Sequence, residues 1–500
     1  MITIKDTMDI LATEQAGDTA PLTKDDLLTI LAKQRASFEK EGFVTYERRM
    51  DRLNRLESLL YDNIDILCEA LRQDFGHRSL HQSKIADFYG SFEALKHTKK
   101  HLKKWMKDEK RQSPFPLGLL GAKSKVQYQP KGVVGNITTW NFPVFVACTP
   151  LIGILAAGNR CMLKLTEITP KTSELLKQLF AKYFDETEVV GITGGPEVGE
   201  AFSTLPLDHI IFTGATSVGK YILRGAAENL TPVTLELGGK SPVVVSRSAD
   251  MKEAVLRIFT GKALNCGQVC ISPDYVFVPE EQLELFTKLA TMHITEMFPT
   301  MLNNDDYTSV VSRKHYDRIM GIIEDAQEQG ADVRIINPAK EDFNTQTTTH
   351  KIPLTMIVNP SDDLRAMQEE IFGPVISIKT YKNIDDAINY INANPRPLSL
   401  YYFGDDAGEQ AEVLDRTTSG GVAVNDVIAH AGVEDLPFGG IGPSGMGNYH
   451  GFEGFKTFSH AKAIFSQSKK IYMMKYTGVI PPYNDKTEKT LEFMLKRPKK

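Results

Sequence analysis

Three residues in this sequence are of the types that carry out covalent chemistry on a carbonyl carbon. Cys270 lies in Asn-Cys-Gly-Gln-Val-Cys-Ile-Ser, Glu236 lies 34 positions earlier in Val-Thr-Leu-Glu-Leu-Gly-Gly, and Asn141 lies in Thr-Trp-Asn-Phe-Pro. They supply a thiol nucleophile, a carboxylate base and an amide donor for an oxyanion. The sequence therefore predicts attack on a carbonyl group, provided that the fold brings the three side chains together.

Each of these residues also has a structural interpretation when it is taken alone. A single cysteine is more often a small buried apolar residue than a nucleophile, but the polar segment around Cys270 predicts a partly exposed turn. Glu236 follows a short apolar run, where burial would raise its pKa toward the range of a general base, although a strand-end ion pair is the alternative. Asn141 precedes Phe142-Pro143, and a turn cap explains it as well as an oxyanion donor does.

Short apolar runs alternate with helical stretches from about residue 128 onward. Alternation of this kind predicts parallel sheets with right-handed crossovers. The Gly238-Gly239 pair separates two such series and is the predicted domain boundary. The predicted strands are 132–138, 160–165, 209–214, 241–246 and 274–278, and the predicted helices are 172–183, 217–228 and 251–263.

The N-terminal part predicts a tail followed by helices. The first 20 or so residues are polar and aperiodic, which favours a mobile tail. Thr23 begins a capping box before the first apolar stripe, and Thr45 opens a second amphipathic helix that extends to Ile64. Residues 142–158 are apolar enough to suggest a membrane span, but their prolines and glycine indicate a buried helix instead.

Composition narrows the class of partner and the compartment. The net charge of −5 and the pI of about 6.2 argue against a nucleic acid or an anionic membrane. The N-terminus lacks a secretory pattern and the C-terminus lacks an apolar anchor, so a cytoplasmic protein is expected. Five cysteines in 500 residues form no disulfide framework, and their spacing predicts no metal site.

A glycine-marked loop at residues 212–220 connects a predicted strand to a predicted helix. Such a turn places backbone N–H groups at a helix N-terminus, where a pyrophosphate binds. Tyr221 replaces the Ser or Thr of a P-loop, and Gly214 is followed by Ala215 rather than by the spacing of GxGxxG. Taken alone, the loop is weak support for nucleotide binding.

Six motifs in order resemble the aldehyde dehydrogenase superfamily, over residues 25 to 475. Further resemblance to the class 3 and fatty-aldehyde branch lies in 443–452 and 457–460, and the segment 128–135 is most similar to bacterial coniferyl aldehyde dehydrogenases. The six motifs are Trp140-Asn-Phe-Pro143, Phe212-Thr-Gly-Ala-Thr-Ser-Val-Gly219, Leu235-Glu-Leu-Gly-Gly239, Gly267-Gln-Val-Cys270, Glu369-Glu-Ile-Phe-Gly-Pro374 and Pro437-Phe-Gly-Gly440.

The resemblance implies NAD(P)-dependent oxidation of an aldehyde to a carboxylic acid through a thiohemiacetal and a thioester on Cys270. Asn141 would hold the oxyanion, Glu236 would activate water, and Phe142 and Phe438 would line a substrate tunnel. NAD is expected, with NADP possible. The implied cofactor-binding residues are Trp140, Lys164, Glu167, Gly214, Ser217, Gly219, Glu370 and Phe372.

The expected fold is α/β, with a Rossmann-type cofactor domain (23–112 and 131–238), an α/β catalytic domain (239–445) and a small β arm (113–130 and 458–475) that joins a homodimer. The expected tail covers 1–22. Coniferyl aldehyde or a similar aromatic aldehyde is the favoured substrate, and a long-chain aliphatic aldehyde is the alternative. A CoA-acylating enzyme is disfavoured by Glu236, and a non-catalytic relative by the complete set of chemical groups. Cys266 is close enough in sequence to pair with Cys270 under oxidation.

Overall fold

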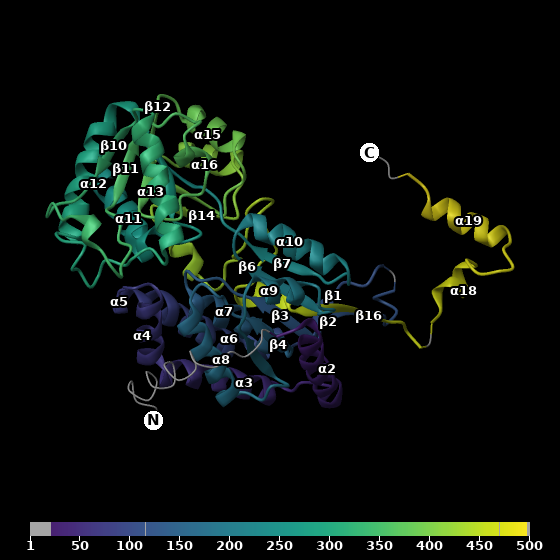
Figure 1. The fold of residues 1–500 in the computed structure, drawn as a ribbon. Helices are drawn as coiled ribbons and strands as arrows, with labels where there is room; N and C mark the ends of the chain where they lie inside the picture. The colour runs from purple at the N-terminus through teal and green to yellow at the C-terminus, as the bar shows by residue number, and fades with distance from the viewer. Residues whose placement is uncertain (1–21, 116, 470, 498–500) are drawn as a thin grey trace.

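The computed structural model describes residues 22–115, 117–469 and 471–497. Two α/β lobes, each built on its own sheet, lie one above the other in Figure 1, and a third small sheet extends to one side. Residues 1–21 of the predicted tail lie outside the described residues. The α/β class expected from the sequence is confirmed.

The lower lobe is built on a six-stranded sheet in the order β15-β7-β6-β3-β4-β5. All neighbours are parallel except β15, which pairs antiparallel with β7. Strand order reverses between β3 and β6, and ligands bind outside the carboxyl ends of strands at such a point. The strands are β3 (Val133–Ile137), β4 (Arg160–Lys164), β5 (Val189–Ile192), β6 (His209–Thr213), β7 (Val233–Glu236) and β15 (Gly445–Met446).

Helix α7 (Pro143–Ala157) is the apolar segment that the sequence analysis assigns to the interior, and this is confirmed. It begins with Pro143, whose missing N–H costs nothing at a helix start, and ends at Gly158 in the left-handed conformation. Nearly all of its side chains are buried. The other helices of this sheet are α8 (Pro170–Tyr183), α9 (Pro196–Ser203) and α10 (Thr216–Ala227).

N-terminal helices cover the outer side of this lobe. The capping box at Thr23 is present, with reciprocal bonds between Thr23 and Asp26. The second helix ends at Asp62 rather than Ile64, because Asn63 leaves the helical conformation and its side chain bonds the Leu59 carbonyl. These elements are α2 (Lys24–Glu41), α3 (Tyr46–Asp62), α4 (Ile64–Asp74), α5 (Leu80–Ser83), the π-helix η2 (Lys84–Tyr89) and α6 (Gly90–Trp105).

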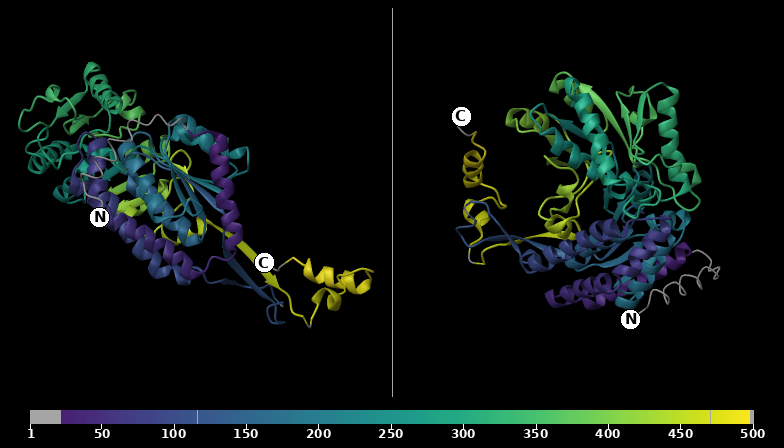
Figure 2. Two further views of the ribbon diagram at one scale, coloured as in Figure 1. Left: turned by 60° about the horizontal axis from the view of Figure 1, so that its bottom comes forward. Right: turned by 90° about the vertical axis from the view of Figure 1, so that its left-hand side faces the viewer.

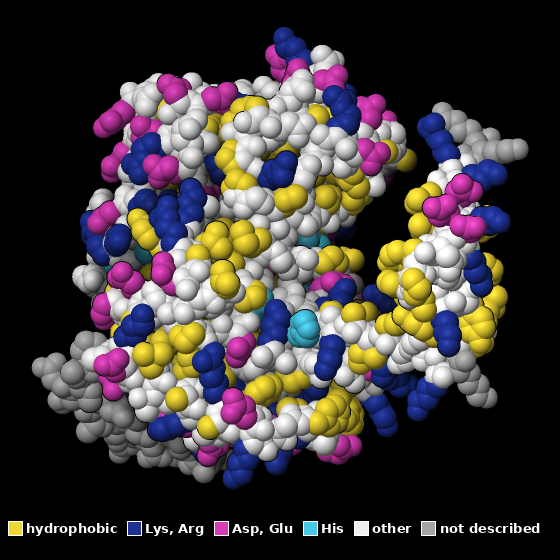
Figure 3. Space-filling model, turned by 90° about the vertical axis from the view of Figure 1, so that its right-hand side faces the viewer, with side chains coloured by type: hydrophobic (Ala, Val, Ile, Leu, Met, Phe, Trp, Pro, Cys, Tyr) yellow, Lys and Arg dark blue, Asp and Glu magenta, His cyan; other side chains and the backbone are white. Residues whose placement is uncertain are grey.

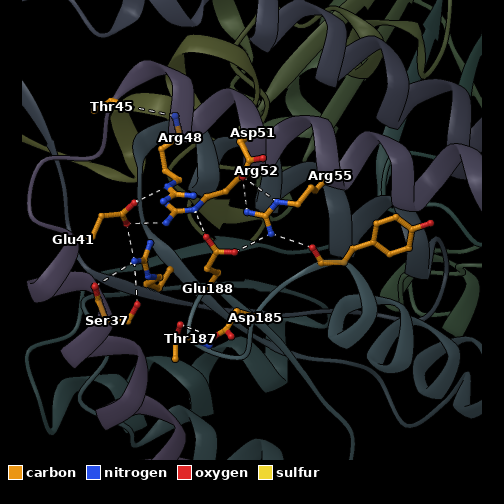
Figure 4. Close-up of polar contacts among 12 residues, drawn as sticks. Ser37, Glu41, Thr45, Arg48, Asp51, Arg52, Arg55, Asp185, Thr187 and Glu188 are labelled. Atoms are coloured by element: carbon orange, nitrogen blue, oxygen red, sulfur yellow. Dashed lines mark hydrogen bonds and ion pairs between the residues drawn. The ribbon is translucent and has the colours of Figure 1, made fainter.

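A partly buried ionic network ties α2 and α3 to the sheet (Figure 4). Arg52 lies between Glu41 and Glu188, at 2.7 and 3.0 Å. Arg160 of β4 contacts Glu41 at 2.6 Å, and Arg55 contacts Glu188 at 2.8 Å. Because breaking a buried pair leaves an uncompensated charge, loss of one partner costs about 3–5 kcal/mol. The network therefore fixes the N-terminal helices on the lower lobe.

The upper lobe is built on a seven-stranded sheet in the order β10-β11-β12-β9-β8-β13-β14. Only β10 runs antiparallel to its neighbour. The chain enters this sheet directly after Gly238-Gly239. The strands are β8 (Ser241–Val245), β9 (Pro273–Pro279), β10 (Asp332–Ile335), β11 (Thr355–Val358), β12 (Val375–Tyr381), β13 (Ser399–Phe403) and β14 (Gly421–Val424).

The helices of the upper lobe are α11 (Met251–Ala263), α12 (Leu283–Met297), α13 (Arg313–Glu328), α14 (Arg365–Gln368), α15 (Ile384–Ala393) and α16 (Ala407–Arg416). Its 3₁₀ turns are η3 (Leu264–Gly267), η4 (Glu280–Gln282), η5 (Phe343–Thr345) and η6 (Ala429–Gly432).

The third sheet forms an arm that projects from the body (Figure 2). Its strands are β1 (Glu109–Arg111), β2 (Lys123–Pro130) and β16 (Ser459–Ser466), all antiparallel, and α17 (Gly451–Thr457) leads into β16. The sheet starts earlier than predicted, because β1 lies before residue 113. Beyond β16 the chain forms α18 (Met473–Thr477) and α19 (Asp485–Met494), two helices that the sequence analysis does not predict.

Helices α18 and α19 extend this arm, and apolar side chains are exposed along them, as the space-filling view shows (Figure 3). Tyr476, Phe493 and Leu495 are 63%, 81% and 79% exposed. Exposed apolar groups that gather in one place indicate an interaction surface. No helix among the described residues is long and apolar enough to cross a membrane.

Candidate active site

A cavity of about 700 Å³ lies at the junction of the two lobes. It is lined by the carboxyl ends of strands in the lower sheet and by loops of the upper sheet. The predicted site residues that line it are Trp140, Asn141, Phe142, Gly214, Glu236, Cys270, Glu370, Phe372 and Phe438. The fold therefore brings the three proposed chemical groups into one space.

Cys270 follows a backbone segment with an unusual conformation. Asn265, Cys266 and Gly267 all have positive φ, at 48°, 55° and 71°. A side chain on Gly267 would lie 2.1 Å from the Gly373 carbonyl oxygen, so only glycine fits this approach. The turn delivers Cys270 to the cavity as a partly exposed thiol, as the sequence predicts.

Gln268 stabilises that turn from within. Its Nε2 donates to the carbonyls of Asn265 and Ser309 at 2.9 and 3.0 Å, and its Oε1 accepts from the Val311 N–H at 2.9 Å. The side chain is fully buried. This role could not be predicted, since Ser309 and Val311 lie more than 40 positions away and leave no local signal in the sequence around Gln268.

Asn141 is held directly against the turn. Its Nδ2 donates to the Gln268 carbonyl at 3.2 Å, and its own carbonyl accepts from Asn265 Nδ2 at 3.0 Å. One of the two Nδ2 hydrogens remains for a further acceptor. The amide is thus oriented beside Cys270.

A buried ion pair, which the sequence gives no reason to select, supports Asn141 from the other side. Arg78 Nη1 donates to the Asn141 carbonyl at 2.9 Å, and Arg78 Nη2 donates to Asp87 at 2.7 Å. Asp87 Oδ1 in turn accepts from the N–H groups of Val144 and Phe145, each at 3.2 Å. Arg78 and Asp87 therefore link Asn141 to the first turn of α7.

Glu236 is the last residue of β7 and is 3% exposed. Neither carboxylate oxygen has a hydrogen-bond partner among the residues that the structure describes. Burial raises the pKa of Glu236 well above its ordinary value. A buried, unpaired carboxyl is costly, so its presence at the cavity wall points to a chemical role.

The electrostatic field at Cys270 disfavours the thiolate in the ligand-free chain. Burial raises the pKa of the Cys270 thiol to about 12, and the Glu370 and Glu236 carboxylates contribute to the rise. The N–H groups of Cys270 and Ile271 act in the opposite direction. These same N–H groups are available to a negative charge that develops at the sulfur or on a carbon bound to it.

Glu370 lies on a tightly fixed turn. A side chain on Gly238 would lie 2.2 Å from Glu370 Oε2, so the glycine allows the carboxyl to approach. Arg318 donates to the carbonyls of Glu370 and Ile371 at 3.2 and 2.6 Å, and Lys240 pairs with Asp274, which accepts from the Ile371 N–H. Burial raises the pKa of Glu370 to about 7.

Trp140 and Phe372 form an aromatic wall of the cavity. Their ring centres are 5.3 Å apart in an edge-to-face arrangement. Phe372 has a φ of 45°, which is rare for a bulky side chain and shows how firmly the turn is determined. His315 contacts Trp140 edge to face at 4.7 Å.

Four predicted cofactor residues do not line the cavity. Lys164 is buried at the end of β4, where Nζ donates to the Leu165 carbonyl and contacts Glu167 at 3.3 Å. Ser217 is exposed on the first turn of α10. Gly219 is buried, and a side chain there would lie 2.8 Å from Leu237 Cδ2, which gives this glycine a packing role.

Cys266 and Cys270 face different surroundings. Cys266 is 1% exposed and packs in an apolar cluster with Val310. Cys270 packs beside Val269 in a separate cluster. Both are free thiols, and their pairing remains a hypothesis that this arrangement does not favour.

Two further lining residues, Tyr449 and His450, had no predicted role of their own. Tyr449 and His450 belong to the 443–452 segment and line the cavity together with Glu434. The resemblance of this motif to a known family does not by itself assign them a function. The signal that could have indicated a cavity position is a histidine inside a glycine-rich segment.

Comparisons with known proteins agree with this geometry. Residues 6–464 match the family described as "Aldehyde dehydrogenase family". The chain is 53% identical to the "Probable coniferyl aldehyde dehydrogenase" of Caulobacter vibrioides, across 94% of this chain and 96% of that protein. It is 49% identical to the "Coniferyl aldehyde dehydrogenase" of a Pseudomonas species, across 90% and 92%.

Solved structures show the same fold. A substrate-bound Staphylococcus aureus AldH superposes with a TM-score of 0.86 at 33% identity, across 94% of this chain and 99% of that one. A Mycobacterium tuberculosis aldehyde dehydrogenase in complex with NAD⁺ gives 0.79 at 25% identity, across 91% and 92%.

Proposed function

The chain belongs to the aldehyde dehydrogenase family, and on this premise we propose that it oxidises an aromatic aldehyde of the coniferyl type to the carboxylic acid, with NAD as hydride acceptor. The observation that carries the proposal is the meeting of Cys270, Glu236 and Asn141 at one cavity. Two relatives at 53% and 49% identity that are named for coniferyl aldehyde support the substrate class.

In the first step the Cys270 thiol loses its proton to solvent, and the thiolate Sγ adds to the aldehyde carbon to give the oxyanion of a thiohemiacetal. The oxyanion accepts from the free Nδ2 hydrogen of Asn141 and from the Cys270 N–H. Because the pKa of the thiol is raised to about 12 in the ligand-free chain, loss of its proton requires a change in the field on ligand binding. A positively charged group near Sγ would supply that change.

In the second step the carbon becomes a thioester on Cys270 as it loses hydride. A bound nicotinamide ring would accept the hydride. Glu236 then takes a proton from a water molecule, and the resulting hydroxide adds to the thioester carbon. The C–S bond breaks to release the acid, and the proton held by Glu236 returns to Cys270 Sγ. Its raised pKa suits a group that must accept a proton near neutral pH.

The chain's residues fit a dinucleotide. Glu370 presents a carboxyl to the cavity beside Trp140 and Phe372, where it can accept from ribose hydroxyls. Gly214 precedes α10 at the point where strand order reverses, the expected place for a pyrophosphate. At the end of β4, Glu167 carries an exposed carboxylate that disfavours a 2′-phosphate, so NAD is proposed ahead of NADP.

Two other activities are weaker candidates. A CoA-acylating enzyme has no need of a buried base at the thioester, whereas Glu236 is present and unpaired. A non-catalytic relative has no need of a reactive set, yet the nucleophile, base and donor are all in place. A long-chain aliphatic aldehyde is the alternative substrate within the same mechanism.

The proposal is tested by measuring the absorbance of NADH or NADPH as the purified protein turns over an aldehyde. Coniferyl aldehyde, a long-chain aldehyde and a short aldehyde are compared. Fastest turnover of coniferyl aldehyde with NAD is expected. Faster turnover of the long-chain substrate would favour the alternative, and no turnover of any aldehyde with either cofactor would contradict the proposed function.

We also propose that the arm joins two copies of the chain in a homodimer. The exposed apolar residues of α18 and α19 support this, because such a surface is rarely left in water. A cytoplasmic location is proposed as well. Its support is that all five cysteines are free thiols, as in a reducing compartment.

A further inference from the structure

The cavity has a polar end that the proposed chemistry does not use. Most of the wall beyond Cys270 is apolar, with Phe145, Val269 and Ile428 among its residues. Glu434 and His450 interrupt this surface. Polar groups in an otherwise apolar pocket fix the orientation of a ligand and provide specificity.

Glu434 is held in place by its neighbour across the loop. The Gly451 N–H favours the ionised form of the Glu434 carboxyl. Gly451 has a φ of 48°, and a side chain on it would lie 2.1 Å from the backbone carbonyl oxygen of Glu434, so the two residues approach closely. The carboxyl is largely withdrawn from water. Burial raises the pKa of Glu434 to about 7, and the nearby Glu93 opposes ionisation less strongly.

His450 is 2% exposed, and neither ring nitrogen has a hydrogen-bond partner in the described part of the chain. Its ring stacks on Phe438 at 4.8 Å and meets Tyr449 edge to face at 4.5 Å. Burial lowers the pKa of His450 to about 3, so the ring is neutral and offers one donor and one acceptor. An unpaired buried donor and acceptor is unfavourable until a ligand satisfies it.

Tyr449 connects the polar end to the reactive groups. It lines the same cavity as Cys270, Glu236, Glu434 and His450. The charges of Glu236, Cys270 and Glu434 add to the effect of burial in raising the pKa of its hydroxyl. Tyr449 also packs edge to face against Phe438 and His450, with ring centres 6.1 and 4.5 Å apart. A rigid, flat substrate whose aldehyde lies at Cys270 would place its opposite end near Glu434 and His450.

We propose that Glu434 and His450 form a subsite for the phenolic hydroxyl of a 4-hydroxyaryl aldehyde. The phenol O–H donates to the Glu434 carboxyl, and the phenol oxygen accepts from the His450 N–H. An alkyl chain would offer Glu434 no donor and would leave the buried His450 ring nitrogens without partners, so the subsite selects against aliphatic aldehydes. This inference rests on the proposed function and extends it to a substrate feature.

The test compares 4-hydroxy-3-methoxycinnamaldehyde with its 4-O-methyl ether, which lacks the donor. The wild-type chain is expected to favour the phenol in kcat/KM by about tenfold or more. In Glu434→Met this ratio falls to about one, while kcat/KM for the ether changes less than threefold. Glu434→Gln, which keeps a weaker acceptor, gives an intermediate ratio, and Asp435→Asn, on an exposed neighbour, keeps the wild-type ratio.

If Glu434 had a purely structural role, Glu434→Met and Glu434→Gln would lower kcat/KM equally for the phenol and for the ether. That result would overturn the subsite. So would equal use of phenol and ether by the wild type. Calorimetric binding of coniferyl alcohol and its 4-O-methyl ether tests the subsite without turnover. Coniferyl alcohol could bind about tenfold tighter than its 4-O-methyl ether, with Glu434→Met removing that difference, while no aldehyde is oxidised. In that case the proposed function fails and the subsite stands.

Discussion

Asn141 donates from Nδ2 to the carbonyl oxygen of Gln268 at 3.2 Å, two residues before Cys270. This bond ties a loop of the lower lobe to the nucleophile turn of the upper lobe. Arg78 holds the Asn141 carbonyl at 2.9 Å from the opposite side. The amide is therefore oriented before any substrate arrives.

Asn141→Ala is expected to lower kcat by about 100-fold to 1,000-fold, because removal of one oxyanion donor has effects of that size. KM for the aldehyde should change little. Arg78→Lys keeps the charge but loses the planar guanidinium that donates to the Asn141 carbonyl and to Asp87 at the same time. A smaller loss of about tenfold in kcat is therefore expected. Steady-state kinetics measure both variants, and unchanged kcat in Asn141→Ala would remove Asn141 from the oxyanion site.

Glu236→Gln is expected to stabilise the protein at alkaline pH. The pKa of Glu236 is raised in the folded chain above its unfolded value of about 4.3, so the folded state keeps a proton that the unfolded state loses. The contribution of this group to stability is therefore lost as pH rises from the unfolded toward the folded pKa. We expect Tm at pH 8 to rise by about 1–3 °C, with a smaller gain at pH 5. A lower Tm at pH 8, measured by calorimetry, would contradict this interpretation.

Gly219→Ala and Ser217→Ala separate packing from cofactor binding on α10. The added methyl group at residue 219 meets Leu237 at 2.8 Å, so a loss of about 1–3 kcal/mol in the free energy of unfolding is expected. Ser217 is exposed, and its change should leave the unfolding curve unaltered while KM for NAD rises. Denaturant unfolding and cofactor titration report on the two effects. Equal stability of the two variants would contradict the packing role.

Leu491→Glu together with Phe493→Glu tests the arm as a dimer contact. These residues of α19 are 39% and 81% exposed, and charges on them would be buried against a second copy. Light scattering after size-exclusion chromatography should show the wild type as a dimer and the double variant as a monomer. Leu285→Glu, on α12 of the upper lobe, serves as the control and should remain a dimer.

Much of the fold could be predicted from local pattern. The alternation of strands and helices located β3, β4, β6, β8 and β9, and the capping box located the start of α2. Helices α18 and α19 were missed because they are short and their apolar side chains face away from any core of this chain, so no buried stripe marks them. The predicted domain boundaries remain predictions.

Some residues of the active site could likewise be predicted from the sequence, and others could not. Cys270, Glu236 and Asn141 could be selected because their residue types and flanking glycines suggest chemistry. Arg78, Asp87 and Gln268 could not, because their partners lie far away in sequence and only the fold brings them together. Nothing in the sequence around Glu434 marks it for a cavity, because its burial beside Gly451 follows from the loop conformation.

The most direct measurement is mass spectrometry of Glu236→Gln after it is mixed with NAD and coniferyl aldehyde. Without the base that activates water, one NADH should form rapidly per chain, and a peptide containing Cys270 should gain the mass of the acyl group. Cys270→Ala should show neither signal. Steady turnover by Glu236→Gln at the wild-type rate, with no acyl adduct on Cys270, would contradict the assignment of nucleophile and base.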